Sequence, residues 1–272
     1  MSRRSISTAA CLIIGDEILN GKIQDTNSNY FAKKCFEVGI DLKHITVVPD
    51  EEEDIVQAVK RLAPKYDFIV TSGGIGSTHD DITYDAIGKA FDLPVVLHAT
   101  TAQRMKNLSS SKSQLETAPQ EVKDAQLRMA TLPAGSNVEY LYLIETSWVP
   151  VVSIDSKIFI LPGVPSIFQD LLDALLVEIK GRVSQDQAQV RYFVSTKLIE
   201  SQIAPYLRNL QNSVDSNIKI GSYPHFKQKL VTVSIIGPKS RDHKLREIVK
   251  DVSKNTSGTE ISAEEEALSL DV

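Results

Sequence analysis

The sequence predicts an α/β protein in which a doubly wound, mostly parallel sheet is followed by a second, smaller α+β domain. Over the first ninety or so residues, short apolar runs alternate with amphipathic helical patterns. The runs are typical of strands buried on both faces, and a β-α-β-α-β-α order favours parallel pairing through crossover helices. Beyond residue 190 the order becomes β-α-β-β-α, which indicates a separate α+β layer.

The first part of the chain supplies three strands and three helices in alternation. The expected strands cover residues 9–14, 42–48 and 67–71. The expected helices cover residues 25–38, 51–63 and 83–91. Gly39 and Pro64 end the first two helices, and Pro49-Asp50 ends the second strand.

The rest of the first domain is interrupted by a polar, helical insertion at residues 99–128, in which residues 109–111 form an exposed bend. Strands are then expected at 140–144 and 158–161, before a helix with core spacing from 165 to 179. Periodicity is lost at 181–189, so the first domain is placed at 1–183 and the small domain at 190–256. Its strands are expected at 192–196, 218–223 and 230–236, and its helices at 201–210 and 241–252. Residues 257–272 read as an acidic tail that is frayed or weakly docked.

Composition excludes several classes of partner. The chain has 30 Lys and Arg against 35 Asp and Glu, a net charge of −5, so we expect neither nucleic acid nor an anionic membrane as a partner. The first apolar run is too short to span a bilayer, and we expect a cytoplasmic protein. A mitochondrial presequence would have to overlap the first strand. The two cysteines, Cys11 and Cys35, are expected to be buried thiols.

The most informative segment is the turn Ser72-Gly73-Gly74-Ile75-Gly76-Ser77-Thr78, directly after the third strand. Its glycines allow successive N–H groups to point into one concavity, and its hydroxyls and the helix that follows add further donors. We predict that this turn binds a phosphate. It is not a P-loop, because it contains no lysine, and His79 stands where a dinucleotide fingerprint needs its third glycine.

Carboxylates are expected beside this turn, since ligands of open parallel sheets bind beyond the carboxyl ends of the strands. The predicted cluster follows the three strands and comprises Asp16, Glu17, Asp50, Asp80 and Asp81. Acidic residues would repel a phosphate unless a cation lay between them, and oxygen ligands alone favour a hard cation such as Mg²⁺. The alternative for each acid is a helix N-cap or a solvated loop charge, above all for Asp81.

Other candidate residues have a more ordinary interpretation. The five histidines show no metal-ligand spacing, and His79 alone could donate to a ligand oxygen. Trp148 and Phe168 are expected in the core rather than as a platform for a base.

Four stretches together resemble one family, the molybdopterin-binding (MoCF-type) domain family, and specifically its CinA branch, which includes the amino-terminal domain of eukaryotic FAD synthase. The stretches are Ile14 to Asn27, Thr71 to Thr83, Leu161-Pro162-Gly163-Val164-Pro165 and Ile220 to Pro224. They occur in the family's order over nearly the whole chain. One segment departs from the bacterial pattern, because Glu145 to Pro150 replaces an Asn-Pro and Ala-Pro-Gly stretch.

The resemblance implies a MoCF-like fold and a metal-dependent pyrophosphatase that cleaves FAD or ADP-ribose to AMP and the other half. It places Asp50 and Asp81 in the site and assigns Pro162, Gly163, Val164 and Pro165 to the ligand pocket. Together with Asp80 of the acidic cluster, Asp50 and Asp81 are the catalytic candidates. The expected cofactor is Mg²⁺ or Co²⁺, with K⁺ as a further candidate, and relatives lead us to expect a homodimer.

Two other functions remain open at this point. The chain could be a non-catalytic module that binds a pterin or flavin nucleotide, which the altered segment from Glu145 to Pro150 favours. It could also transfer an adenylyl group to molybdopterin, as cofactor-making relatives do.

Overall fold

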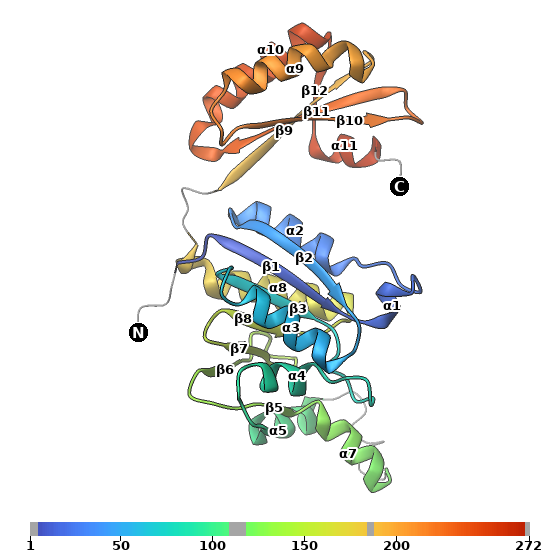
Figure 1. Cartoon of the computed structure of the whole chain (residues 1–272), viewed down its shortest axis with the longest axis vertical. Helices are drawn as coiled ribbons and strands as arrows, with labels where there is room; N and C mark the ends of the chain where they lie inside the picture. The colour runs from blue at the N-terminus through green and yellow to red at the C-terminus, as the bar shows by residue number, and fades with distance from the viewer. Residues whose placement is uncertain (1–4, 109–117, 184–187, 270–272) are drawn as a thin grey trace. The chain divides into compact units, whose positions relative to one another are not determined.

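A computed structural model describes residues 5–108, 118–183 and 188–269, and its contacts divide the chain into two units (Figure 1). The first unit comprises residues 1–36 and 40–184 and the second comprises residues 37–39 and 185–272, so the main division falls after residue 184. This division lies inside the stretch of residues 181–189 where the sequence loses its periodicity. The first unit holds a mostly parallel sheet and the second a smaller antiparallel one, so the predicted fold class is confirmed.

The sheet of the first unit has six strands in the order β2-β1-β3-β8-β7-β6. Its strands are β1 (Thr8–Ile14), β2 (Asp41–Val48), β3 (Phe68–Ser72), β6 (Val138–Leu141), β7 (Val151–Ile154) and β8 (Ile158–Leu161). The first four in the order pair in parallel, whereas β7 and β6 pair antiparallel. Nearly every residue of β1 and β3 is buried, as the unbroken apolar runs predict.

Helices cover both faces of this sheet. They are α2 (Asn27–Val38), α3 (Glu52–Leu62), α4 (Thr83–Ala90) and α8 (Pro165–Ile179). Alternate residues of β1, such as Ala10 and Leu12, share a core cluster with α3 and α4. On the other face, Phe31 of α2 packs against Phe68, with ring centroids 5.6 Å apart. Phe168 of α8 is fully buried, as predicted.

The expected insertion forms the helices α5 (Ala99–Leu108) and α7 (Gln120–Arg128). It is flanked by two short antiparallel strands, β4 (Val95–Leu97) and β5 (Thr131–Pro133), which the sequence did not predict. Strands of three residues are too short to show a period. The expected bend at 109–111 lies outside the described residues. The short helix α1 (Asp16–Leu19) and strand β7 were also missed, and β6 begins two residues before the predicted strand at 140–144.

The second unit contains a four-stranded antiparallel sheet in the order β10-β11-β9-β12. Its strands are β9 (Gln189–Thr196), β10 (Lys219–His225), β11 (Leu230–Pro238) and β12 (Thr259–Ile261). Its helices are α9 (Glu200–Ser213), α10 (Asp242–Thr256) and α11 (Ala263–Ser269), and a short 3-10 turn covers Lys239–Arg241. A second 3-10 turn, Lys180–Arg182, follows α8 in the first unit. One core cluster, which includes Val194, Val233 and Leu245, joins the sheet to α9 and α10.

The tail after residue 256 was expected to be frayed or weakly docked, and its described residues, up to 269, are docked and not frayed. Strand β12 pairs with β9, and Glu266 of α11 is 7% exposed beside the buried His225, 3.4 Å away. The tail reads as solvated because it is acidic. Its ordering depends on a strand of three residues and on one buried carboxylate, neither of which periodicity can detect.

Two smaller predictions concern cysteines and membranes. Cys11 and Cys35 are buried free thiols, as expected, and burial raises the pKa of both. Within the described residues, no helix has both the length and the apolar character that a membrane crossing requires.

Candidate functional site

The turn after β3 has a backbone that requires glycine at two positions. Gly73 and Gly74 have φ angles of +111° and +63°. A Cβ on Gly73 would lie 2.0 Å from the carbonyl oxygen of Ile14, and a Cβ on Gly74 would lie 2.3 Å from Thr83 Oγ1. The hydroxyl of Thr83 donates to Gly73 O at 2.9 Å, and its N–H donates to Gly74 O at 2.9 Å. Hence β1, the turn and the start of α4 are locked together.

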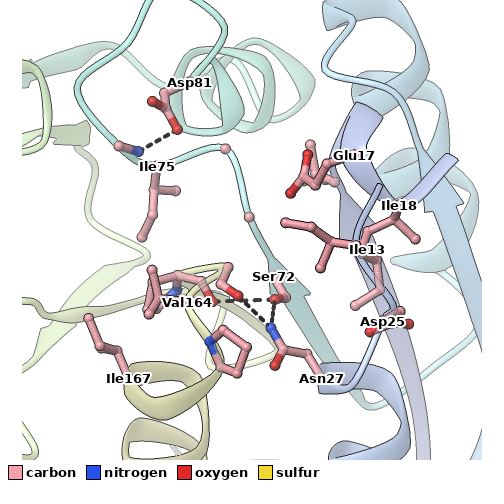
Figure 2. Close-up of a pocket in the computed structure, with 18 of the residues that line it drawn as sticks. Ile13, Glu17, Ile18, Asp25, Asn27, Ser72, Ile75, Asp81, Val164 and Ile167 are labelled. Atoms are coloured by element: carbon pink, nitrogen blue, oxygen red, sulfur yellow. Dashed lines mark hydrogen bonds between the residues drawn. The ribbon is translucent and has the colours of Figure 1, made fainter. Parts of the chain in front are cut away.

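Asp81 closes the turn from its far side. Its carboxylate accepts the N–H of Gly76 at 2.6 Å and the N–H of Thr78 at 2.9 Å, and it also accepts the Thr78 hydroxyl. Figure 2 shows Asp81 bonded to the turn beside Ile75. The side chain that was predicted to bind metal thus fills part of the predicted phosphate nest. Its geometry is that of a turn-stabilising aspartate.

Three N–H groups of the turn remain for a ligand. Within the described part of the chain, no acceptor pairs with the N–H groups of Gly74, Ile75 and Ser77. Gly74 and Ile75 line the cavity, whereas Ser77 and the exposed Thr78 do not. An anion can therefore bind the Gly74-Ile75 side of the turn without displacing Asp81.

Ser72 and Asn27 form a buried polar junction beneath the turn. The Asn27 side-chain amide donates to Ser72 Oγ at 2.9 Å and to the carbonyl oxygen of Gly163 at 2.8 Å. Ser72 Oγ in turn donates to Pro162 O at 3.3 Å. Because Asn27 begins α2, this junction ties three segments of the cavity wall together (Figure 2). Ser72 is 1% exposed and its hydroxyl is engaged in this junction, so its main part in the cavity wall is to support the turn.

Replacing this junction should loosen the cavity wall. We expect Asn27→Ala to lower the free energy of unfolding by about 1 to 3 kcal/mol, because Gly163 O would lose its buried donor. The control is Asn107→Ala, which removes an exposed amide from α5 and should change stability by less than about 0.5 kcal/mol. Chemical denaturation of the two variants measures the difference, and equal midpoints would contradict this role of Asn27.

A cavity of about 460 Å³ opens against the turn. All of the residues that line it belong to the first unit. In Figure 2 the turn with Ile75 and Asp81 lies opposite Ile13, Glu17 and Ile18, and the junction at Ser72 and Asn27 lies between them. Volumes of this order accommodate a small organic ligand.

The predicted ligand residues are divided by the structure. Those that line the cavity are Ser72, Gly73, Gly74, Gly76, Pro162, Gly163, Val164 and Pro165, along with the acids Glu17 and Asp81. Those that do not line it are Ser77 and Thr78 of the turn and the acids Asp16, Asp50 and Asp80. His79 is exposed. In the described residues, no three His, Cys, Asp or Glu side chains converge as a ready metal centre.

Negative charge nonetheless concentrates beside the turn. Asp50 Oδ1 lies 3.4 Å from the position of a Cβ on Gly74, and Asp50 Oδ2 accepts the N–H of Asp16 at 3.0 Å. Burial raises the pKa of Asp50 above its ordinary value, and the nearby carboxylates of Glu17, Asp16 and Asp80 raise it further. The Asp16 N–H opposes this shift without cancelling it. The surroundings of Asp50 therefore disfavour its charged form.

Sequence reasoning missed several cavity residues. Trp148 was predicted to be core, but it is half-buried and lines the cavity, as Met129 does. Arg128, from the end of the insertion, donates to the carbonyl oxygen of Asp81 at 3.3 Å and brings a positive charge to the turn. The polar composition of the insertion at residues 99–128 was the sequence feature that could have indicated a contact with the turn. Asp25 also lines the cavity, where it accepts the N–H of Ser28 at 3.0 Å.

Comparison with protein families gives two matches. Residues 10–181 match the model described as a probable molybdopterin binding domain, and residues 191–265 match the middle domain of FAD synthase. A solved structure from Thermoplasma acidophilum, titled the protein CinA with unknown function, has a TM-score of 0.55 and 24% identity. It covers 64% of this chain and 98% of its own, and at that identity it bears on the fold alone.

Three relatives are similar in sequence. A probable FAD synthase from Caenorhabditis elegans is 31% identical over 82% of this chain, and the match spans only 44% of that protein. A CinA-like protein from Mycolicibacterium vanbaalenii is 32% identical over 76% of this chain and 50% of its own length. A protein from Pyrococcus abyssi is 32% identical over 84% of this chain and 90% of its own length. The chain thus spans about half the length of the first two of these relatives.

Proposed function

The chain belongs to the molybdopterin-binding domain family, and we propose that it is a metal-dependent nucleotide pyrophosphatase that cleaves FAD, ADP-ribose or a similar dinucleotide. The products are AMP and the other half of the substrate. The observation that carries this proposal is that two kinds of group lie next to each other. The N–H groups of Gly74 and Ile75 have no acceptor among the described residues, and beside them lie the crowded carboxylates around Asp50. A phosphorylated ligand fits the donors, and a cation would offset the carboxylates.

The donor set fits a hard divalent cation. The cavity lining includes the carboxylates of Glu17, Asp25 and Asp81, and among the described residues it includes no lysine, arginine or histidine. Asp25 and Asp81 already accept backbone N–H groups, whereas the Glu17 carboxylate has no partner within the described residues. Mg²⁺ commonly binds through one or two carboxylates together with substrate phosphates, so no preformed group of three acids is needed. Glu17 would hold it together with Asp50, which lies outside the cavity lining but places its Oδ1 3.4 Å from the Cβ position of Gly74, while its Oδ2 accepts the N–H of Asp16.

The proposed reaction is a hydrolysis. The oxygen of water forms a bond to one phosphorus atom, the bridging P–O bond breaks, and the two phosphate monoesters share the protons of the water between them. A divalent cation supplies neutralisation of phosphate charge and polarisation of the phosphorus toward attack. The chain's own part is to hold one phosphate on the turn and to enclose the rest of the ligand in the cavity, which fixes the orientation of the scissile bond.

The turn can be tested through Asp81. In the original protein both carboxylate oxygens of Asp81 accept hydrogen bonds from Gly76 and Thr78. Asp81→Asn replaces one of these oxygens by an NH₂ group, which cannot accept, so the turn should lose its shape. We expect release of AMP from ADP-ribose to fall by at least about tenfold. The control is Asp85→Asn, on the exposed side of α4, which should keep the activity of the unmodified protein. Undiminished hydrolysis by the Asp81 variant would contradict the assignment.

A second candidate is a module that binds a nucleotide without turnover. The observation that favours it is the engagement of both Asp81 oxygens within the turn, which leaves fewer acids free for chemistry than the sequence predicted. The two functions differ in one measurable outcome. A binding module would retain ADP-ribose with or without a divalent cation and release no AMP.

A further inference from the structure

We infer that Trp148 is the platform on which the planar heteroaromatic ring of the ligand stacks. This deepens the proposed function, because it rests on the same cavity and names the part of the substrate that the apolar wall would recognise. Trp148 is the only tryptophan in the chain. Its loop, residues 145–150, is also the segment in which the sequence departs from the bacterial family pattern.

The chemistry of the cavity calls for more than a phosphate. Around the turn and Glu17 the wall is polar, but much of the remaining wall is formed by apolar side chains. They include Ile13, Ile75, Met129, Trp148, Val164 and Ile167. Val164 and Ile167 are 53% and 36% exposed, a solvent exposure that a ligand ring would remove. A nucleotide carries a phosphate and a flat ring, and so matches both kinds of wall.

Trp148 belongs to the lining of the cavity. Trp148 is half-buried, and within the described residues its side chain makes no hydrogen bond and no ring contact. Buried tryptophan N–H groups normally find an acceptor in the protein. Trp148 is therefore a residue of the cavity wall and not the core residue that its apolar neighbours in the sequence suggested.

The loop that carries Trp148 is held in place. Arg104 of α5 donates to the carbonyl oxygens of Glu145 at 3.1 Å and Ser147 at 2.9 Å. Within the loop, Val149 N–H donates to Ser147 Oγ at 3.2 Å. A platform gains affinity when its position is fixed before the ligand arrives, and Arg104 provides that fixation.

Arg104 is in turn anchored by its own surroundings. Its guanidinium lies 4.6 Å from the ring centroid of Tyr142, whose hydroxyl shares a hydrogen bond of 2.7 Å with the fully buried Thr101. Thr101 belongs to the same helix, α5. The insertion is therefore connected to the cavity through a chain of contacts, and Arg104 is a positioning residue for Trp148.

The sole tryptophan makes the test direct. Intrinsic fluorescence of the full chain is followed while AMP, FMN or ribose 5-phosphate is added, each with Mg²⁺ and with chelator. We expect AMP to quench the emission if adenine occupies the platform, and FMN to quench it if the flavin does. Ribose 5-phosphate, which has no aromatic ring, and buffer alone should leave the emission unchanged. No change in emission with any ring-bearing ligand that calorimetry shows to bind would overturn the inference.

Variants supply the second readout, by calorimetric titration with ADP-ribose. Trp148→Leu should weaken binding by about tenfold or more, because stacking on an aromatic side chain is lost. Trp148→Phe should bind within about threefold of the original protein, since it keeps a ring. Phe226→Leu, at an 83% exposed site of the second unit, is the control and should bind unchanged. Wild-type affinity in a folded Trp148→Leu variant would refute the platform.

Arg104→Met tests the positioning role. It should shift the emission maximum of Trp148 before any ligand is added. Arg104→Lys, which keeps a donor, should show a smaller shift. Unchanged emission in Arg104→Met would contradict this role.

These outcomes are separable from the fate of the proposed function. Ring-dependent binding without AMP release would refute the pyrophosphatase and keep the platform. AMP release with the same KM in the original protein and in Trp148→Leu would keep the pyrophosphatase and refute the platform.

Discussion

A Gly73→Ala variant is expected to lose about 3 kcal/mol or more of folding free energy and, with it, nucleotide binding. The new methyl group would lie 2.0 Å from the carbonyl oxygen of Ile14, and the residue would have to adopt a φ of +111°. The clash is with the backbone at the carboxyl end of β1, which cannot move aside without disturbing the pairing of β1 with β2 and β3. Thermal and urea unfolding, together with ADP-ribose titration, measure both effects.

Gly21→Ala is the matched control for this variant. Gly21 also has a positive φ, +74°, but no atom lies within 4 Å of its Cβ position. It should cost about 1 to 2 kcal/mol from backbone strain alone and leave binding unchanged. Should Gly73→Ala prove no worse than Gly21→Ala, the close approach of the turn to β1 would not be what fixes the site.

The second large effect is expected at Asp50, where stability and activity should change in opposite directions. Its folded-state pKa is raised, so the stability that it contributes is present at low pH and is lost as pH rises from its ordinary value of 3.8 through the folded value. Asp50→Asn removes the unfavourable charge and can still accept the N–H of Asp16. We expect equal or greater thermal stability at pH 7 without added metal.

The same substitution should abolish the response to cations. Mg²⁺ should raise the melting temperature of the original protein and not that of Asp50→Asn, and AMP release should fall by at least about tenfold. Asp54→Asn, at an exposed position in the first turn of α3, should behave like the original protein. If Asp50→Asn were less stable at pH 7 and equally active, both the electrostatic argument and the cation site would be wrong.

The sequence was most informative where chemistry is local. The turn at residues 72–78 and its place at the end of a buried strand follow from glycine spacing next to an apolar run, and the structure has both. The role of Asp81 could not be derived in the same way. Whether it faces a metal or the N–H groups of Gly76 and Thr78 depends on backbone angles that the sequence does not reveal.

Long-range contacts account for the other misses. Trp148 looks like a core residue beside Val149 and Pro150, whereas its loop is held by hydrogen bonds from Arg104, more than forty residues away along the chain. The buried pair of His225 and Glu266 likewise orders a segment whose composition suggests solvent. Short strands and single buried polar contacts do not leave a periodic pattern, so the prediction was weakest there.

The most direct test of the account is product analysis after incubation of the purified chain with FAD and, separately, with ADP-ribose. Each substrate is supplied with Mg²⁺, with Co²⁺ or with chelator, and AMP is quantified by chromatography. We expect AMP and an equimolar amount of the other half from at least one substrate, and only when a divalent cation is present. Absence of AMP under every condition, with ADP-ribose still bound, would contradict the pyrophosphatase and leave a nucleotide-binding module.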